Sequence, residues 1–200
     1  MIVLKGTDGV FLAAPAMMLN NHVECDPDSL YREENQPVWL TDTGIAVGVE
    51  GNPFLAMLLR TDPELRVESL DREYLLNGFL PKLKKRLEAF EKLVRDGNMP
   101  GRVLLATAKE AVLITGRFCL RGINGDEAFG ADEDWALTAM KLTAAPSRQA
   151  HLYNIYSVGE KVSGYRLFPV SVVSVSPRTA ERFLLMENGK RRKVNANESA

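Results

Sequence analysis

The alternation of apolar and polar residues predicts that the chain opens with strands. Apolar runs at residues 2–4 and 10–13 flank Gly6-Thr7-Asp8-Gly9, whose Asp-Gly pair suits a tight hairpin turn. A second pair of runs, at residues 38–40 and 45–49, flanks Thr41-Asp42-Thr43-Gly44 in the same way. The polar segment 20–36 predicts an irregular connection between the two hairpins.

A short helix is predicted next, over residues 54–60. Asn52 and Pro53 suit its first positions, because Asn accepts from free backbone N–H groups and Pro fits the first turn. Thr61-Asp62-Pro63 ends it.

A longer helical segment is predicted after Ser69, with acidic residues at 71 and 73 near the positive end of the helix dipole. Four apolar residues follow at helical spacing: Leu83, Leu87, Phe90 and Val94. Asp96-Gly97 and Pro100 end this segment. Whether Asn77-Gly78 divides it into two helices is left open by the pattern.

The second half returns to strands and then to a further helix. Residues 103–107 and 112–115 form a hairpin pattern, and the acidic residues 132–134 start a helix with an apolar stripe at Trp135, Ala139 and Leu142. A short helix over residues 149–158, a strand over 167–175 interrupted at Pro169, and a last hairpin turning at Asn188-Gly189 complete the chain. This order of strands and helices indicates an α+β layered domain.

Composition and charge narrow the class of protein. Hydrophobic residues make up 46% of the 200 residues, which is enough to bury a core and excludes disorder and fibrous repeats. With 25 basic and 26 acidic side chains, the net charge is -1, so a broad basic surface for nucleic acid or an anionic membrane is not expected.

Location is indicated by the cysteines and the apolar segments. Cys25 and Cys119 lie far apart and form neither a disulfide framework nor a metal-binding pair. The apolar stretch 11–19 is interrupted by Pro15 and is too short to span a membrane or to favour a secretion signal. We therefore expect a cytoplasmic protein with no membrane partner.

The sequence lacks the residues that several kinds of chemistry require. No glycine-rich phosphate loop and no Gly-x-Ser-x-Gly motif occurs, and His22 and His151 are the only histidines. His22, Cys25 and Asp26 are close enough in sequence to share a metal, but a loop or core role is favoured. We expect no metal and no cofactor.

Three segments together resemble the proteasome β-subunit family, and most closely the bacterial proteasome-like peptidase that works with an unfoldase ATPase. The first is Asp8-Gly9-Val10-Phe11-Leu12-Ala13-Ala14, and the second runs from Leu40 to Gly51 and into the helix that follows. The third is Leu104 to Glu110, followed by Ala128-Phe129-Gly130-Ala131-Asp132 and the helix from Trp135. The resemblance covers residues 1 to about 145 and is thinner over residues 146–200.

The resemblance implies a single domain over residues 1–200 with a four-layer αββα sandwich, in which helices cover both sides of two stacked antiparallel sheets. It also implies an N-terminal threonine nucleophile with its own α-amine as general base, held by an aspartate, a lysine and a serine. A glycine N–H stabilises the oxyanion.

Carried onto this chain, most of that site is missing. The nucleophile falls before Met1, the aspartate on Pro15, the lysine on Gln36 and the serine on Ala131, whereas the oxyanion glycine is present as Gly48. Neither a proline nor a neutral amide supplies the missing charge. We therefore expect a dismantled peptidase site with no catalytic residue.

Other candidate nucleophiles have simpler interpretations. Gly6-Thr7 matches the junction at which family propeptides are cut, but Thr7 is interpreted as a turn residue of the first hairpin. Cys25 has only His22 as a nearby base, and Cys119 is interpreted as a core residue. Trp39 and Trp135 are likewise interpreted as core residues.

Two basic runs are interpreted as solvated surfaces. Lys82, Lys84, Lys85 and Arg86 spread over the polar face of a helix, with docking of a neighbouring subunit as the alternative. The segment 190–193 lies at the end of the last hairpin, with binding of an acidic partner or nucleic acid as the alternative.

Three hypotheses for the function remain. The first is a non-catalytic, ring-forming protein of the proteasome-like fold, with self-association and an unfoldase ATPase or related subunits as partners. The second is an N-terminal-nucleophile peptidase or amidohydrolase with a processed or unusual site, using Thr7, or Glu33 or Glu34 in the place of the lysine. The third is a module that binds a peptide or small ligand in the cleft around Gly48.

Overall fold

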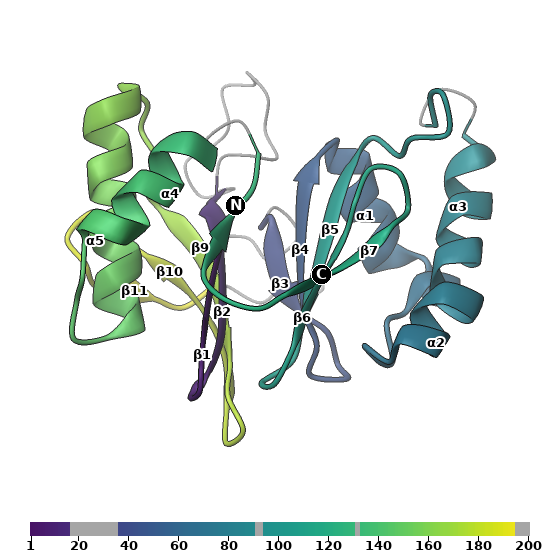
Figure 1. The fold of residues 1–200 in the computed structure, drawn as a ribbon, viewed down its shortest axis with the longest axis horizontal. Helices are drawn as coiled ribbons and strands as arrows, with labels where there is room; N and C mark the ends of the chain where they lie inside the picture. Colours follow the sequence, from purple (N-terminus) through teal and green to yellow (C-terminus); the bar gives the residue numbers. More distant parts are fainter. Residues whose placement is uncertain (17–35, 91–93, 131–132, 195–200) are drawn as a thin grey trace, which may run out of the picture.

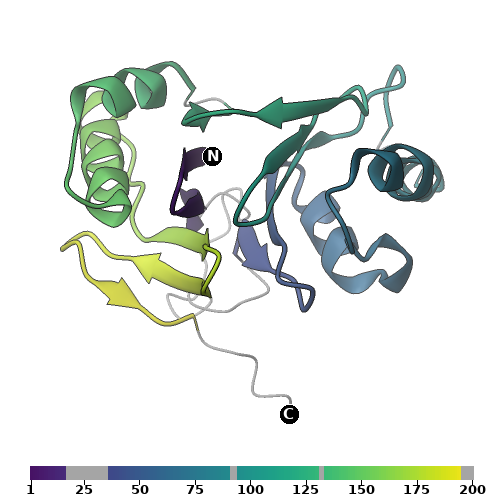
Figure 2. The ribbon, with the colours of Figure 1, turned by 60° about the horizontal axis from the view of Figure 1, so that its bottom comes forward.

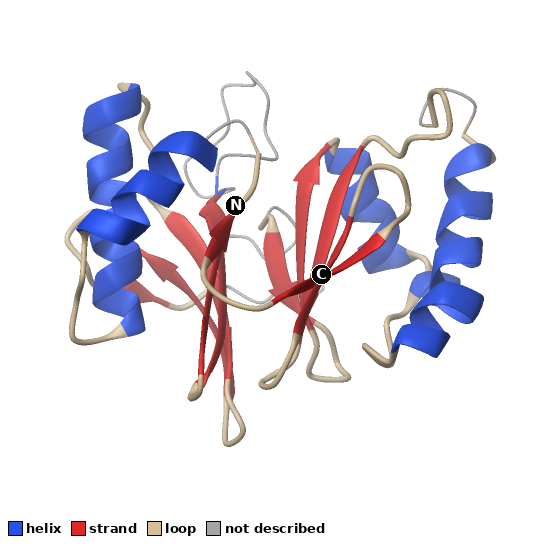
Figure 3. Ribbon diagram, viewed as in Figure 1, coloured by secondary structure: helices blue, strands red, loops and turns tan. Residues whose placement is uncertain are grey.

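The fold is a sandwich of two antiparallel sheets with helices on both outer sides, as the family resemblance implies (Figures 1 and 3). This computed structural model describes residues 1–16, 36–90, 94–130 and 133–194. Helices α4 and α5 cover one sheet, and α1 to α3 cover the other (Figure 1). Turning the molecule keeps the two helical layers on opposite sides of the strands (Figure 2).

The first sheet has six strands in the order β11-β10-β9-β2-β1-β8. Their bounds are β1 Ile2–Gly6, β2 Gly9–Pro15, β8 Glu127–Ala128, β9 Val170–Val175, β10 Ala180–Leu185 and β11 Arg191–Arg192. The first hairpin turns at Thr7-Asp8, with Gly6 opposite Gly9. The last hairpin joins β10 to β11 across Asn188-Gly189. Both turns are where the sequence predicts them.

The second sheet has five strands in the order β3-β4-β5-β6-β7. Their bounds are β3 Val38–Leu40, β4 Ala46–Gly51, β5 Gly101–Ala106, β6 Ala111–Ile114 and β7 Leu120–Ile123. The sequence predicts β3 to β6. It does not predict β7 or β8, because both are short and rich in glycine or charge.

The central strands are buried on both faces. In β5, Val103 and Leu105 pack against α1 to α3, whereas Leu104 and Ala106 face the other sheet. Successive side chains of a strand point to opposite faces. Two-sided burial therefore explains why residues 103–106 form a continuous apolar run instead of an alternating one.

The helices on the five-stranded sheet follow the predicted starts. Their bounds are α1 Pro53–Thr61, η4 Pro63–Leu65, α2 Arg72–Tyr74, η5 Leu75–Phe79 and α3 Leu80–Glu88. The Asn52 side chain accepts from the Phe54 N–H, and Asp71 accepts from two N–H groups at the start of α2. Asn77-Gly78 does not separate two helices, because the wider turn of η5 joins α2 to α3 without a break.

The apolar stripe after Ser69 is only partly helical. Helix α3 ends at Glu88, so Phe90 lies beyond it, is 44% exposed and packs edge-on against Phe54 of α1. Phe90 therefore packs against α1 from beyond the end of α3, and not as part of a helical stripe.

Helices α4 (Glu133–Leu142) and α5 (Arg148–Ser163) cover the six-stranded sheet. Helix α5 is longer than the predicted short helix. A Cβ added to Gly159 would lie 2.4 Å from the Trp135 ring, so this glycine lets the two helices pack closely. Of the predicted stripe, Ala139 is buried, but Leu142, the last residue of α4, is 76% exposed and lies outside the core.

Candidate functional site

The start of β1 lies against the opposite sheet. The backbone nitrogen of Met1 donates a hydrogen bond of 2.8 Å to the carbonyl oxygen of Phe129. A Cβ added to Gly48 would lie 2.6 Å from Met1 Sδ. The Met1 thioether therefore occupies the space that the missing side chain of Gly48 leaves on β4.

The surroundings of Met1 are apolar and aromatic. A small pocket at this point is lined by Met1, Ile2, Pro15, Phe129, Trp135, Ala136 and Tyr156. None of these lining residues carries a carboxylate, an amine side chain or a thiol. A hydroxyl nucleophile needs an adjacent base. The described lining of this pocket offers no side-chain base.

The structure brings some of the predicted site residues together. Pro15 ends β2 and shares the small pocket with Met1, and Gly48 contacts Met1 from the other sheet. Gln36 is 1% exposed, and its carbonyl oxygen accepts from the guanidinium of Arg60. Ala131 lies outside the described residues, as do His22, Cys25, Glu33 and Glu34.

The remaining candidates lie elsewhere. Thr7 is exposed in the β1–β2 turn, in line with its interpretation as a turn residue. Cys119 is exposed, so its interpretation as a core residue is wrong. It lies in the tight turn between β6 and β7, next to Phe118, which has a φ of 57°. Its neighbours Phe118 and Leu120 pack against the core, whereas the Cys119 side chain does not.

A cleft of about 680 Å³ lies next to this region, between the end of the five-stranded sheet and the start of α4. Glu50 follows Gly48 by two residues and lies on the same face of β4, and Phe129 lines both the small pocket and the cleft. The charged lining residues are Glu50, Arg102, Arg117, Arg121 and Glu133. The cleft therefore extends from Gly48 as a charged surface.

The cleft charges are paired unequally. Arg121 makes a close ion pair with Glu127, with 2.7 Å between nitrogen and oxygen. Arg102 lies 3.6 Å from a Glu50 oxygen and 3.9 Å from a Glu133 oxygen. Arg117 makes no ion pair with any of the described residues. Guanidinium donors thus remain available in the cleft.

Sequence reasoning missed these cleft residues. They come from strands and turns between residues 50 and 133, and only the strand pairing places Arg102 directly opposite Glu50. One signal was present in the sequence: Glu50-Gly51 and Gly101-Arg102 place charged residues beside glycines at the ends of apolar strands.

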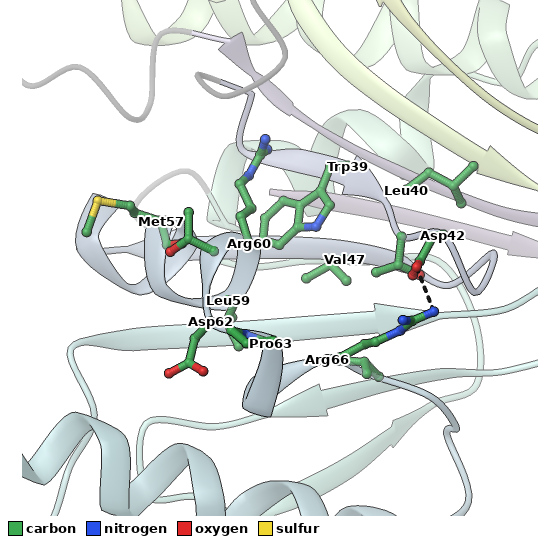
Figure 4. Close-up of a pocket in the computed structure, with 13 residues that line it drawn as sticks. Trp39, Leu40, Asp42, Val47, Met57, Leu59, Arg60, Asp62, Pro63 and Arg66 are labelled. Atoms are coloured by element: carbon green, nitrogen blue, oxygen red, sulfur yellow. Dashed lines mark hydrogen bonds and ion pairs between the residues drawn. The ribbon is translucent and has the colours of Figure 1, made fainter. Parts of the chain in front are cut away.

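A second pocket, of about 590 Å³, lies between the β3–β4 hairpin and the end of α1 (Figure 4). The Arg60 guanidinium lies 4.2 Å from the centre of the Trp39 ring, a cation–π distance. Arg66 pairs with Asp42 at 2.6 Å on the open side of the pocket. Both residues of that pair are exposed, so the pair adds little stability.

Asp62 stands where this pocket meets α3. Its carboxylate pairs with the guanidinium of Arg86 and caps η4 by accepting from the Glu64 N–H. The hydrogen bond from Arg86 lowers the pKa of Asp62 below its ordinary value and raises the pKa of Arg86. Arg86 is therefore tied to η4, whereas Lys82, Lys84 and Lys85 of the same basic run are exposed.

No group of three or more His, Cys, Asp or Glu side chains is placed to hold a metal ion in the described part of the chain. Over the same residues, no helix combines the length and apolar character that crossing a membrane requires.

Comparisons with known proteins show similarity at the level of fold. Two solved structures of Thiobacillus denitrificans BPH match this chain with a TM-score of 0.66. One, in complex with epoxomicin, is 13% identical and aligns over 88% of this chain and 97% of its own. The other is 16% identical, over 88% and 96%. No family model matches the chain, and no curated protein matches it either.

The class defined by these findings is an α+β sandwich of two antiparallel sheets between helical layers. The chain shares this fold over 88% of its length with the BPH protein of Thiobacillus denitrificans.

Proposed function

We propose that this chain is a non-catalytic protein of the proteasome-like fold whose copies assemble into a ring. The contact between Met1 and Gly48 carries this proposal. Under the resemblance described above, Gly48 stands at the oxyanion position, next to which a peptidase of this kind needs a hydroxyl nucleophile and a base. Here the side-chain atom nearest to a Cβ added at Gly48 is the sulfur of the Met1 thioether, which is neither.

The neighbouring positions support the same conclusion. Pro15 and Gln36 stand where the resemblance places an aspartate and a lysine, and neither carries a charge. Electrostatic activation of a nucleophile depends on such charges. The apolar lining around Met1 offers no replacement among the described residues.

Exposed apolar side chains on opposite outer layers support self-association. Met57 and Phe90 are 50% and 44% exposed beside α1, and Val162 and Tyr165 are 67% and 72% exposed at the end of α5. These helices belong to the two different outer layers (Figure 3). A ring closes through contacts between two different surfaces of each copy, and two such surfaces are available.

The proposed function also specifies the domain, the cellular location and the partners of the chain. The chain acts as one domain over residues 1–200, in the cytoplasm, without metal or cofactor. Its partners are further copies of itself and an unfoldase ATPase or related subunits, and neither a membrane nor nucleic acid is among them.

Binding of epoxomicin tests the absence of a nucleophile. The BPH protein forms a complex with epoxomicin and therefore serves as the positive control. Both proteins are incubated with epoxomicin and with fluorogenic peptides, and intact mass and fluorescence are recorded. We expect neither turnover nor an adduct for this chain. Peptide cleavage that epoxomicin blocks would show that the site is active.

Native mass spectrometry tests the assembly separately. We expect a closed oligomer whose mass is a whole multiple of the subunit mass, at micromolar protein concentration. A monomer at every concentration measured would refute ring formation and leave the conclusion about catalysis unaffected.

A further inference from the structure

The charged cleft next to Gly48 has the properties of a ligand site. Its volume of about 680 Å³ lies within the range of about 300–1,000 Å³ typical of ligand pockets. Its walls come from separate parts of the chain: Glu50 and Arg102 lie on adjacent strands, Arg117 follows β6, and Glu133 begins α4. The pairing of β4 with β5 and the position of the start of α4 therefore build the cleft.

Arg102 has unused hydrogen-bonding capacity inside this cleft. Its nitrogens lie 3.6 Å from Glu50 and 3.9 Å from Glu133, beyond ordinary hydrogen-bond length, and it donates no side-chain hydrogen bond to any described residue. A guanidinium carries five N–H donors. The two glutamates hold Arg102 electrostatically without occupying those donors.

Arg117 provides a second guanidinium with unused donors. It lines the same cleft, is exposed, and has neither an ion pair nor a side-chain hydrogen bond with the described part of the chain. Two such guanidiniums in one cleft form a recognition surface for a planar, two-oxygen anion, because each can donate two parallel hydrogen bonds.

We propose that this cleft binds a carboxylate group through Arg117 and Arg102. The surrounding charges select for a single negative charge. Arg121 is already neutralised by Glu127, and Glu50 and Glu133 disfavour a doubly charged phosphate by repulsion. The site is independent of ring formation, because all of its residues belong to one copy.

Titration calorimetry with capped peptides tests the proposal on the full chain. The probes are acetyl-Ala-Ala-Glu-Ala-Ala-amide, the same peptide with Gln in place of Glu, sodium butyrate and inorganic phosphate. We expect the Glu peptide to bind at least about tenfold more tightly than the Gln peptide, as one charge-assisted pair provides. Equal affinity for the two peptides, or tighter binding of phosphate, would overturn the proposal.

The butyrate measurement identifies the source of the carboxylate, because butyrate carries the same single charge as the Glu peptide. Tighter binding of the Glu peptide identifies a peptide as the carrier, and equal or tighter binding of butyrate identifies a free small carboxylate. Binding of neither probe would overturn the proposal.

Two arginine variants locate the binding. R117Q removes the exposed guanidinium and is expected to weaken binding of the Glu peptide about tenfold. R178Q is the matched control, because Arg178 is also exposed and unpaired among the described residues but lies in the β9–β10 turn. An equal loss in both variants would exclude the cleft as the binding site. Equal thermal midpoints confirm that both variants are folded.

Discussion

At the scale of single residues, two glycines determine the shape of the charged cleft. Gly51 and Gly101 face each other across the β4–β5 pair, where the cleft begins. A Cβ added to Gly101 would lie 2.1 Å from the carbonyl oxygen of Glu50, far inside contact distance. The two backbones can approach this closely only because neither residue has a side chain.

Replacement of Gly101 by alanine tests this close approach. We expect Gly101→Ala to destabilise the fold by about 1–3 kcal/mol, as overpacking does in a tightly packed region. Gly122→Ala is the control, because a Cβ at that strand position has nothing within 4 Å. Urea unfolding of both variants measures the difference. Similar midpoints for Gly101→Ala and Gly122→Ala would contradict the structure at this point.

At the scale of secondary-structure elements, Asp62 joins three helices. It ends α1, where its N–H donates to the Leu58 carbonyl oxygen, and it caps η4 through Glu64. It also pairs with Arg86 of α3. One carboxylate thus connects consecutive helices to a helix more than twenty residues away in the chain.

The lowered pKa of Asp62 predicts how this connection depends on pH. Because the pKa is lower in the folded than in the unfolded state, the charged carboxylate stabilises the fold above the ordinary aspartate pKa of about 3.9. That stability is lost as the pH falls toward the folded pKa. Asp62→Asn lacks the charge but remains able to cap a helix.

We therefore expect Asp62→Asn to be less stable than the wild type at pH 7, with the difference shrinking below about pH 4. Urea unfolding midpoints at a series of pH values measure it. Asp42→Asn, at the exposed pair with Arg66, should change stability by at most about 1 kcal/mol at pH 7. A stability difference between Asp62→Asn and the wild type that grows as the pH falls would contradict this prediction.

At the scale of the whole molecule, three apolar layers hold four layers of structure together. The middle layer lies between the sheets and includes Val3 and Leu12 from one sheet and Leu104 and Leu113 from the other. The outer layers join each sheet to its own helices. Loss of the middle layer would remove the apolar contacts that hold the two sheets together.

Truncation in the middle layer tests its contribution. Leu104 is fully buried between the sheets, so Leu104→Ala should cost about 2–5 kcal/mol. Leu142, 76% exposed at the end of α4, provides the control, and Leu142→Ala should change stability by less than about 0.5 kcal/mol. Thermal and urea unfolding measure both. Comparable effects of the two truncations would argue against the two-sheet core.

The sequence predicts those parts of the fold whose signals are local. The hairpin turn at Thr7-Asp8, the cap at Asn52 and a strand over residues 103–107 depend on neighbouring residues; the structure confirms the turn and the cap and places the strand at Gly101–Ala106. The extent of α5 and the end of α3 are predicted less well. How far each helix extends depends on the sheet that it covers, and a short window of sequence does not contain that information.

The candidate site, like the fold, is predicted from the sequence only in part. Gly48 is identified from the resemblance, but its contact with Met1 joins residues 47 positions apart and appears only when the sheets stack. The exposed position of Cys119 is also missed, because a turn between two strands places an apolar-looking residue at the surface.

The sequence by itself determines most of the order of strands and helices, the apolar runs of the central strands and the absence of charge at Pro15 and Gln36, because each depends on residue type and near neighbours. Only the tertiary structure places the Met1 thioether on Gly48 and joins Glu50, Arg102 and Arg117 in one cleft. These contacts link distant residues. The position of a charged side chain, at the open surface or in a cleft, depends on how sheets and helices pack. That packing is driven by burial of apolar residues from all parts of the chain, so it cannot be read from neighbouring residues alone.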